Sequence, residues 1–454
     1  MTALPVRPPG TTATALAAGA LCIAAAFGAT ISPKSVIYAV GGCILVALAA
    51  RSLVWLLAAF IVLTFPEELP FGIASGTVAK PLGALLAAAW LLHLLQAREQ
   101  PLRRRMPTPL LATLTAFVGF AAASALWATG GSAVLSDFAR LVQMTLLFVI
   151  VVTASRTRRD VLVIAGAYIA AATATATYAL ASGTTLAGRL TGGIANSNFL
   201  AAALAAGILL AFFALMAARG ALLRVALAGS ILVNGVAFTM TQSRGGVIAL
   251  AAGIVFAVLL AGRWRPHAVG VGMLACAVGG TYFFALAAPA IRDRLTNISA
   301  QGSSGRSDEW QIAYRIFSHH PIGGAGLGNY ALLAPHYATD TLQLLRVQFV
   351  LRGFVAHNTY LQILSELGLI GAALFAALLV VVVATAVRTI VEKRLELDPT
   401  ASAIARGAVA ALLAILVAYA FGSALYQKQL WVLLGLVAAI PALAARDPDA
   451  DASG

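Results

Sequence analysis

The sequence contains few charged residues. Only 10% of its 454 residues are Asp, Glu, Lys or Arg, whereas 61% are hydrophobic and the mean hydropathy is +0.92. Soluble domains carry about 25% charged residues, so this composition excludes a water-soluble globular protein. Only helices and closed barrels satisfy their backbone in lipid, and an apolar run of about 20 residues crosses the bilayer as a helix. The long apolar runs therefore predict an all-α, polytopic membrane helix bundle.

Cysteine is also scarce. Cys22, Cys43 and Cys276 each lie inside an apolar run and show no CxxC spacing, which argues against a disulfide framework and a cysteine zinc site. The net charge of +14 could indicate nucleic acid. However, the arginines form short clusters between apolar runs, which is typical of basic cytoplasmic loops. We therefore expect no nucleic-acid partner.

The apolar runs predict about 12–14 spans. The second and third runs are short and meet at residues 50–51, and losing this pair would leave the parity unchanged. The first run follows Arg7 and resembles a signal peptide, but many spans follow it, so we interpret it as an uncleaved helix. The runs are 13–30, 36–50, 52–65, 79–96, 109–127, 137–153, 160–181, 198–217, 222–240, 245–262, 267–289, 358–387, 403–422 and 428–444.

The charges of the loops predict the orientation. If the N terminus is cytoplasmic, every internal loop considered is basic, whereas external loops such as 66–76, 129–137 and 421–429 contain almost no arginine. The positive-inside rule then places both termini in the cytoplasm. The basic loops are 97–106, 155–160, 218–220, 262–267 and 388–394.

This orientation divides the chain into four parts. We expect N-terminal spans over 1–289, an external loop with amphipathic helices over 290–356, C-terminal spans over 357–445 and a cytoplasmic tail over 446–454.

Three external segments are basic despite this rule. They are 187–193, 241–246 and the long loop after residue 290. Orientation disfavours arginine on the translocated side, so an anionic ligand on the outer face is the natural explanation for its presence.

The stretch "GRLTGGIANSNFLA" (188–201) is the first candidate. Arg189 would face outward, and Asn196 or Asn198 would cap the next span. The alternative is a glycine-rich turn whose arginine extends from the interface into water.

The stretch "TQSRGG" (241–246) opens a membrane helix at its external end. The N–H groups of a helix N terminus attract anions, and arginine can grip a phosphate through two parallel hydrogen bonds. Ser243, Arg244 and Gly245 would thus form a compact phosphate pocket. The alternative is an arginine that anchors a helix end.

The long loop contains "GRSDEWQIAYRIFSHHPIGGAGLGNY" (305–330). Apolar residues at helical spacing predict an amphipathic helix over 307–319 near the membrane surface, preceded by Arg306 as a second anion contact. The glycines after Pro321 predict a flexible turn; they resemble a nucleotide-binding loop only superficially, since no strand precedes them. A structural cap over the bundle is the alternative. The residues at helical spacing are Trp310, Ala313, Tyr314 and Phe317.

His357 precedes Asn358, Thr359 and Tyr360 at the start of the next span. A histidine near neutral pH can take and return a proton, which suits a general base acting on a sugar hydroxyl. An ordinary interfacial histidine is one alternative. A metal cluster is another, because the same loop holds three further histidines, but they lack the spacing typical of zinc sites. We expect no metal and no cofactor. The three further histidines are His319, His320 and His336.

Together these stretches resemble the O-antigen ligase and polymerase family of bacterial envelope glycan assembly. The resemblance covers roughly 185–375 and rests on the arginine and asparagine near 189–198, on "TQSRGG", on "GR…W" followed by "HPIGGAGLGNY", and on "AHNTYLQILSELGLIG". It implies a GT-C-like glycosyltransferase in the inner membrane with its site facing the periplasm or exterior. The up to fourteen apolar runs exceed the span number usual for such a ligase.

The resemblance also implies the reaction and the residue roles. The enzyme would transfer a glycan from an undecaprenyl diphosphate, or another polyprenyl diphosphate, to a hydroxyl on a glycan, lipid or protein acceptor. It would work within membrane lipid, without metal and with inversion. Arg244 and Arg306 would bind the diphosphate with support from Arg189, and His357 would activate the acceptor.

Three other interpretations remain. A polysaccharide polymerase would extend the lipid-linked glycan with the same residues. Another GT-C enzyme would use an acid in the first external loops, with Glu67 and Glu68 as candidates. A transporter or flippase would show polar breaks near the bilayer midplane, whereas most charges here lie at the span ends.

Overall fold

The computed structural model describes most of the chain after residue 51. The predicted run 13–30 and most of 36–50 lie outside the described residues, as do Glu67 and the acidic tail. The described residues are 45, 52–66, 68–69, 73–96, 106–186, 188–192, 194, 196–281, 285, 306–339, 355–392, 395 and 398–444.

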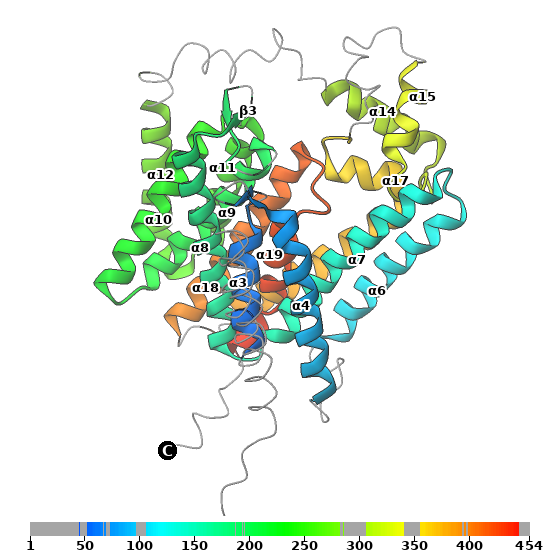
Figure 1. The fold of residues 1–454 in the computed structure, drawn as a ribbon. Coiled ribbons are helices and arrows are strands. Elements are labelled where there is room, and N and C mark those ends of the chain that lie inside the picture. The colour runs from blue at the N-terminus through cyan, green and yellow to red at the C-terminus, as the bar shows by residue number, and fades with distance from the viewer. Residues whose placement is uncertain are drawn as a thin grey trace, which may run out of the picture.

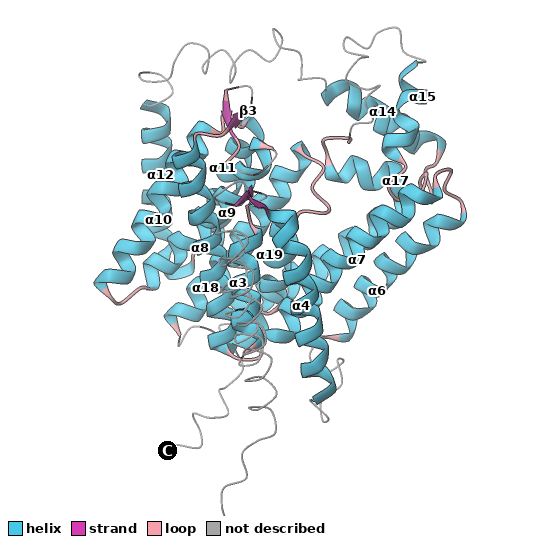
Figure 2. Ribbon diagram, viewed as in Figure 1, coloured by secondary structure: helices cyan, strands magenta, loops and turns pink. Residues whose placement is uncertain are grey.

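The described chain is built of helices with two very short hairpins (Figures 1 and 2). In β1–β2 Glu68 pairs with Ala74, and in β3–β4 Leu186 pairs with Arg189. The first helices and strands are α3 (Leu53–Thr64), β1 (Glu68–Leu69), β2 (Ile73–Ala74), α4 (Ser75–Gln96), α6 (Thr108–Ala123), η2 (Ser124–Leu126), α7 (Gly131–Ala154), α8 (Arg158–Ser182), β3 (Thr185–Leu186) and β4 (Arg189–Leu190). The remainder are α9 (Ser197–Ala217), α10 (Ala221–Met240), α11 (Arg244–Leu260), η3 (Gly262–Trp264), α12 (Arg265–Thr281), α14 (Arg306–His319), α15 (Tyr330–Thr339), α17 (Thr359–Val391), α18 (Pro399–Ala418), η5 (Tyr419–Phe421), α19 (Lys428–Ala438) and α20 (Ile440–Ala444).

Eight helices in the described part are long and apolar enough to cross a membrane. A ninth span results if α11 and α12, between which the chain bends by 115°, are counted together as one span. Each apolar run predicted from residue 52 onward contains a helix. The all-α polytopic bundle is therefore confirmed.

The centre of the bundle is packed through small residues. α9 and α18 contain long runs of buried alanine. A Cβ on Gly253 of α11 would lie 2.5 Å from the side chain of Leu209 on α9, and 2.9 Å from that of Ala414 on α18. Small residues let membrane helices approach closely and gain dispersion contacts. Three helices thus form a tight unit beneath the candidate site.

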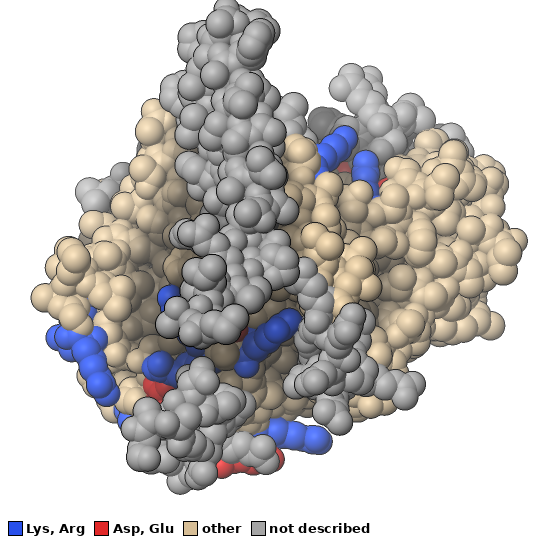
Figure 3. Space-filling model, turned by 60° about the horizontal axis from the view of Figure 1, so that its bottom comes forward, with Lys and Arg blue, Asp and Glu red and all other residues tan. Residues whose placement is uncertain are grey.

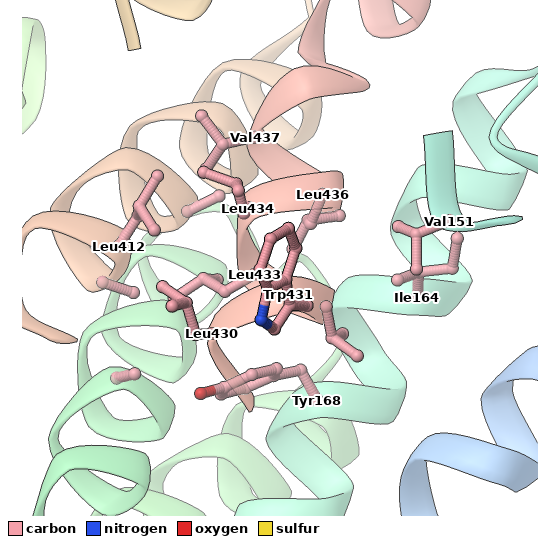
Figure 4. Packing of buried hydrophobic residues seen from close by; sticks show 14 of the residues in the cluster. Val151, Ile164, Tyr168, Leu412, Leu430, Trp431, Leu433, Leu434, Leu436 and Val437 are labelled. Carbon is pink, nitrogen blue, oxygen red and sulfur yellow. The ribbon is translucent and has the colours of Figure 1, made fainter. Parts of the chain in front are cut away.

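A second packed region lies around Trp431 of α19 (Figure 4). Its ring makes an edge contact with Phe148 of α7, and its Nε1 donates to the Leu425 carbonyl at 2.6 Å. Tyr168 of α8 is buried beside the same helix. A buried tryptophan needs such a partner for its N–H, so this contact fixes the turn between α18 and α19.

The loops of the bundle fall at two opposite ends. The basic end, at the bottom of Figure 1, carries the loops α7–α8, α9–α10, α11–α12 and α17–α18. Lysine and arginine gather there in Figure 3, where this end comes forward. The site end, at the top, carries β3–β4, the α10–α11 turn, α14, α15 and the α18–α19 turn. All candidate site residues described therefore share one end. The arginines of the basic loops include Arg156, Arg158, Arg159, Arg219, Arg263 and Arg265.

Candidate functional site

Arg189, Asn198 and Ser243 form one hydrogen-bonded cluster. Arg189 donates from Nε to the Thr241 carbonyl at 2.9 Å and from Nη2 to Asn198 Oδ1 at 2.9 Å. Ser243 Oγ donates to the same Asn198 oxygen at 2.8 Å. The structure thus brings together residues that are up to 54 positions apart, and Arg189 holds the α10–α11 turn in place. Asn196, not Asn198, caps α9 by accepting from the Asn198 N–H.

The α10–α11 turn presents Arg244 at the start of α11. Ser243 is the N-cap, and its Oγ accepts from the Gly246 N–H at 3.0 Å. Gln242 just before it has a φ of +48°, which makes the turn tight. Arg244 is half-buried, and its side chain has no hydrogen-bond or ion-pair partner among the described residues. An unpaired guanidinium at a helix N terminus is well suited to bind an anion.

The two glycines after Arg244 serve helix packing. A Cβ on Gly245 would lie 2.8 Å from the Phe421 side chain, and one on Gly246 would lie 2.7 Å from Ala201 of α9. Gly245 therefore lets Phe421 pack directly against the first turn of α11.

The amphipathic helix expected over 307–319 is α14 (Arg306–His319). Its buried residues are Glu309, Ile312, Ala313 and Ile316, whereas Tyr314 is 62% exposed. The packed side is decided by Tyr330 and Ala334 of α15, which join Ile312 and Ile316 in one cluster.

His357 lies against the buried face of α14. Its Nε2 is 3.9 Å from Oε1 of Glu309, and its Nδ1 is buried without a hydrogen-bond partner among the described residues. The backbone of His357 has a φ of +46°, which is rare for a non-glycine residue and typical of functional sites. Burial, together with the positive charge of Arg306, lowers the pKa of His357 to about 4. The imidazole is therefore neutral near pH 7.

Glu309 is the main residue that the sequence reasoning missed, because an acid in a first helical turn is ordinarily solvated. It is only 6% exposed, and burial raises its pKa to about 8, against the opposing charge of Arg306. The Tyr330 hydroxyl donates to its backbone carbonyl at 3.0 Å and so ties α15 to α14. Arg306, Glu309 and His357 thus form a second cluster.

The glycine turn after α14 is held against a break in α17. α17 leaves helical geometry at Gly368 (φ +63°, ψ −164°). The freed backbone groups pair with the turn: Leu369 N–H donates to the Pro321 carbonyl at 2.8 Å, and Gly326 N–H donates to the Glu366 carbonyl at 2.8 Å. The turn expected to be flexible is therefore fixed by backbone pairing.

Glu366 is a second acid that the sequence reasoning missed. It is 2% exposed, one turn after Gln362, whose Nε2 donates to Glu366 Oε1 at 3.2 Å. Its carboxyl faces the backbone N–H groups of Gly328 and Tyr330. A lone acid in an apolar run is a signal for a special role, and this signal could have identified it.

The α18–α19 turn lies between the two clusters. Phe421 contacts Gly245 in α11, and Gly422 contacts the ring of Phe199 next to Asn198. On the other side, Thr359 Oγ1 donates to the Gly422 carbonyl at 2.7 Å. This turn runs between β3 and α14 in Figure 1. The arginine cluster and the histidine cluster are thus tied to opposite sides of one short segment.

Residues 228–376 match the sequence model of the O-antigen ligase family. This region, called the ligase region below, is therefore similar to the O-antigen ligase family. The ligase region spans α10 to the first half of α17 and contains Ser243, Arg244, Arg306 and His357. Arg189 and Asn198 precede it. A search of curated proteins found no match.

Other predicted residues of the ligase region have clear structural roles. Asn358 caps α17 by accepting from the Tyr360 and Leu361 N–H groups. The Tyr360 hydroxyl donates to the Leu416 carbonyl of α18 at 2.6 Å, so it fixes α17 to α18. His319 and His336 both make edge contacts with the ring of Tyr337. Within the described ranges, no three His, Cys, Asp or Glu side chains converge as metal ligands.

Proposed function

We propose that this bacterial membrane protein of O-antigen ligase or polymerase type is a glycosyltransferase. It takes a glycan from a polyprenyl diphosphate, such as undecaprenyl diphosphate, and transfers it to an acceptor hydroxyl. The observation that carries this proposal is Arg244, an unpaired, half-buried guanidinium among the described residues, linked through the α18–α19 turn to the segment of His357. The arginine cluster can bind the anionic part of a lipid-linked donor, and the histidine cluster at the same end of the bundle can accept a proton from the acceptor.

In this reaction the arginines bind the diphosphate. Arg244 faces the donor from α11 and Arg306 from the start of α14, so they would contact the phosphates from the two sides of the turn. As the bond to the sugar breaks, negative charge grows on the diphosphate oxygens. Guanidinium groups already in place stabilise that charge without reorganisation. Arg189 keeps Arg244 in position through the Thr241 carbonyl and Asn198.

His357 acts as the base for the acceptor. Its imidazole is neutral near pH 7 and its buried Nδ1 has an unused lone pair or proton position among the described residues. Removing the proton from the attacking hydroxyl contributes typically 10²–10⁴-fold in rate. Transfer in a single displacement needs no enzyme nucleophile and inverts the anomeric centre.

The site end would face the periplasm or exterior. The basic loops at the opposite end would then lie in the cytoplasm, as the positive-inside rule requires. A diphosphate headgroup at the outer interface would then lie next to Arg244 and Arg306, which explains why arginine occurs on the side of the membrane where the positive-inside rule disfavours it.

The test is transfer in proteoliposomes by the purified full chain. The donor is an undecaprenyl-diphosphate-linked glycan, and the acceptor is rough lipopolysaccharide or, in a second arm, the donor itself. Arg244→Ala and His357→Ala should each lower transfer at least about 10²-fold. Their matched controls are Arg219→Ala at the basic end and His320→Ala, both at exposed positions.

The product distinguishes the two family activities. Glycan on lipopolysaccharide indicates a ligase, and a longer glycan on the lipid carrier indicates a polymerase. The proposal is refuted if Arg244→Ala and His357→Ala both keep near-normal turnover with the acceptor that the wild type uses.

A further inference from the structure

The buried Glu309 and the partly exposed His357 form a pair at the core of the second cluster. They approach from different elements, α14 and the segment before α17, with 3.9 Å between Glu309 Oε1 and His357 Nε2. This is about 1 Å longer than a hydrogen bond, and catalytic hydrogen bonds in empty sites are often long and tighten with substrate. The outer atoms of the pair, Glu309 Oε2 and His357 Nδ1, are buried without partners in the described part of the chain.

We propose that Glu309 is the positioning residue of His357 and takes up the proton that the imidazole removes from the acceptor hydroxyl. This inference rests on the proposed function, because it requires His357 to be the base. The geometry gives the two ring nitrogens different roles. Since Nε2 faces Glu309, Nδ1 is the atom that meets the acceptor.

The proton and electron balance of the step is simple. Before reaction, the Glu309 carboxylate accepts a hydrogen bond from Nε2–H and the Nδ1 lone pair is free. The acceptor hydroxyl gives its proton to Nδ1, and its oxygen forms the new bond to the anomeric carbon. The bond from that carbon to the diphosphate breaks, and its electron pair leaves on the diphosphate. The Nε2 proton passes to Glu309, so the imidazole ends neutral and Glu309 ends protonated.

The surroundings favour this distribution of the proton. Burial and Arg306 lower the pKa of His357 to about 4, so an imidazolium is poorly tolerated there. Burial raises the pKa of Glu309 to about 8, with Arg306 opposing and Asp308 reinforcing the shift. A base works best when its conjugate acid has a pKa near the working pH. Glu309 meets that condition, whereas His357 alone does not.

Other titratable groups also face this cluster. Tyr330 of α15 lies between Glu309 and the buried Glu366 of α17, and its pKa is raised by burial and by both acids. Tyr330 therefore stays protonated and serves as a neutral donor to the Glu309 carbonyl. The charged neighbours of Glu309 within α14 are Arg306 and Asp308.

Asp308 supplies a matched control. It is the adjacent residue of α14 and also has a carboxyl group, but this group is half-exposed and accepts from Ser307 Oγ at 3.3 Å. Asp308→Asn and Glu309→Gln therefore replace a carboxyl group by an amide at neighbouring positions, and only Glu309→Gln changes the group that faces His357.

The first measurement asks which ring nitrogen of His357 carries the proton in the protein without substrate. It uses NMR of the ¹⁵N-labelled histidines in detergent over a range of pH. The chain has six histidines, and comparison with His357→Ala identifies the signal. In the wild type, His357 should carry its proton on Nε2 above pH 8 and on Nδ1 below it, where protonated Glu309 donates to Nε2. Glu309→Gln should remove this switch, and Asp308→Asn should keep it.

The second measurement is the single-turnover transfer rate against pH in the proteoliposome assay. The wild-type rate should rise with pH to a plateau above about 8, since the carboxylate form is the competent one. Asp308→Asn should keep the rise but reach its plateau at a lower pH, because Asp308 raises the pKa of Glu309. Glu309→Gln should lose about 10²-fold at the plateau and lose the rise, with the KM for donor unchanged. Glu309→Asp should recover part of the rate and serves as the second variant if the glutamine variant does not fold.

The outcomes separate this inference from the proposed function. Active His357→Ala refutes the proposed function itself. Inactive His357→Ala with a wild-type rate, pH profile and histidine spectrum in Glu309→Gln refutes only the role of Glu309. An equal loss at every pH with an unchanged spectrum assigns Glu309 a structural role and also overturns the inference.

Discussion

Replacing Gly368 by alanine should detach the glycine turn from α17. Gly368 has a φ of +63° and a ψ of −164°, a combination that is essentially restricted to glycine. A Cβ there would lie 2.3 Å from the Ile322 carbonyl oxygen and 2.5 Å from the Gly324 nitrogen. Both obstacles are backbone atoms, so no side-chain rotation can relieve the clash.

The expected cost has two parts. The backbone conformation alone costs about 1–3 kcal/mol for a residue with a Cβ. Relieving the clash must also loosen the turn's pairing with α17, which includes the bonds from Leu369 N–H to the Pro321 carbonyl and from Ile370 N–H to the Ile322 carbonyl. Each hydrogen bond contributes about 0.5–1.5 kcal/mol net. The total is about 2–6 kcal/mol, localised where the turn carries α14 against His357.

The assay compares Gly368→Ala with Gly119→Ala in detergent. Gly119 lies in membrane helix α6, and a Cβ there would meet nothing within 4 Å. Gly368→Ala should lower the melting temperature by several degrees and expose the 320–328 turn to protease. It should also reduce transfer, because Arg306 and Glu309 move away from the imidazole. The reasoning is refuted if both variants melt, resist protease and turn over alike.

Three further predictions concern neighbouring contacts. Thr359→Val should cost about 1–3 kcal/mol in thermal unfolding and lower transfer, since Thr359 Oγ1 bonds both the Gly422 carbonyl and the Ala424 N–H; unchanged stability would show that the turn is held otherwise. Glu309 has a pKa raised to about 8 from 4.5, so its contribution to stability is full below about pH 4.5 and is lost as the pH rises through 8. The melting temperature of the wild type should therefore fall over this pH range, and that of Glu309→Gln should fall less. An equal fall in both proteins would refute this prediction. Asn234→Ala should cost about 1 kcal/mol in thermal unfolding, because its buried Nδ2 donates to Thr173 Oγ1 of α8 at 3.1 Å and thereby ties α10 to α8; wild-type stability would contradict this.

The helices could be predicted from the sequence because the membrane imposes one simple requirement. A span must bury its own backbone hydrogen bonds and present apolar side chains, and both features are visible in a linear pattern. The same pattern placed Asn358 at a helix start and Ser243 beside another, where local capping decides the geometry. The arginines stood out because orientation alone does not explain them.

The pairing of Glu309 with His357 could not be predicted in this way. The two residues are 48 positions apart, and whether Glu309 faces water or imidazole depends on which side of α14 packs against α15. The spacing of Trp310 and Tyr314 predicted an amphipathic helix but not which side packs against α15, and that side is the one with Ile312 and Ile316. The position of Gly368 at a break in α17 is equally invisible, because its reason lies in the backbone of a distant turn.

The sequence by itself determined a many-helix membrane protein with basic loops on one side, and it singled out Arg189, Arg244, Arg306 and His357. These features follow from local composition, which acts the same way wherever the chain folds. Only the tertiary structure decided that Arg189 supports Arg244 through Asn198, and that an acid on α14 faces His357. Such contacts depend on which helix faces meet, and that is settled by packing across the whole bundle.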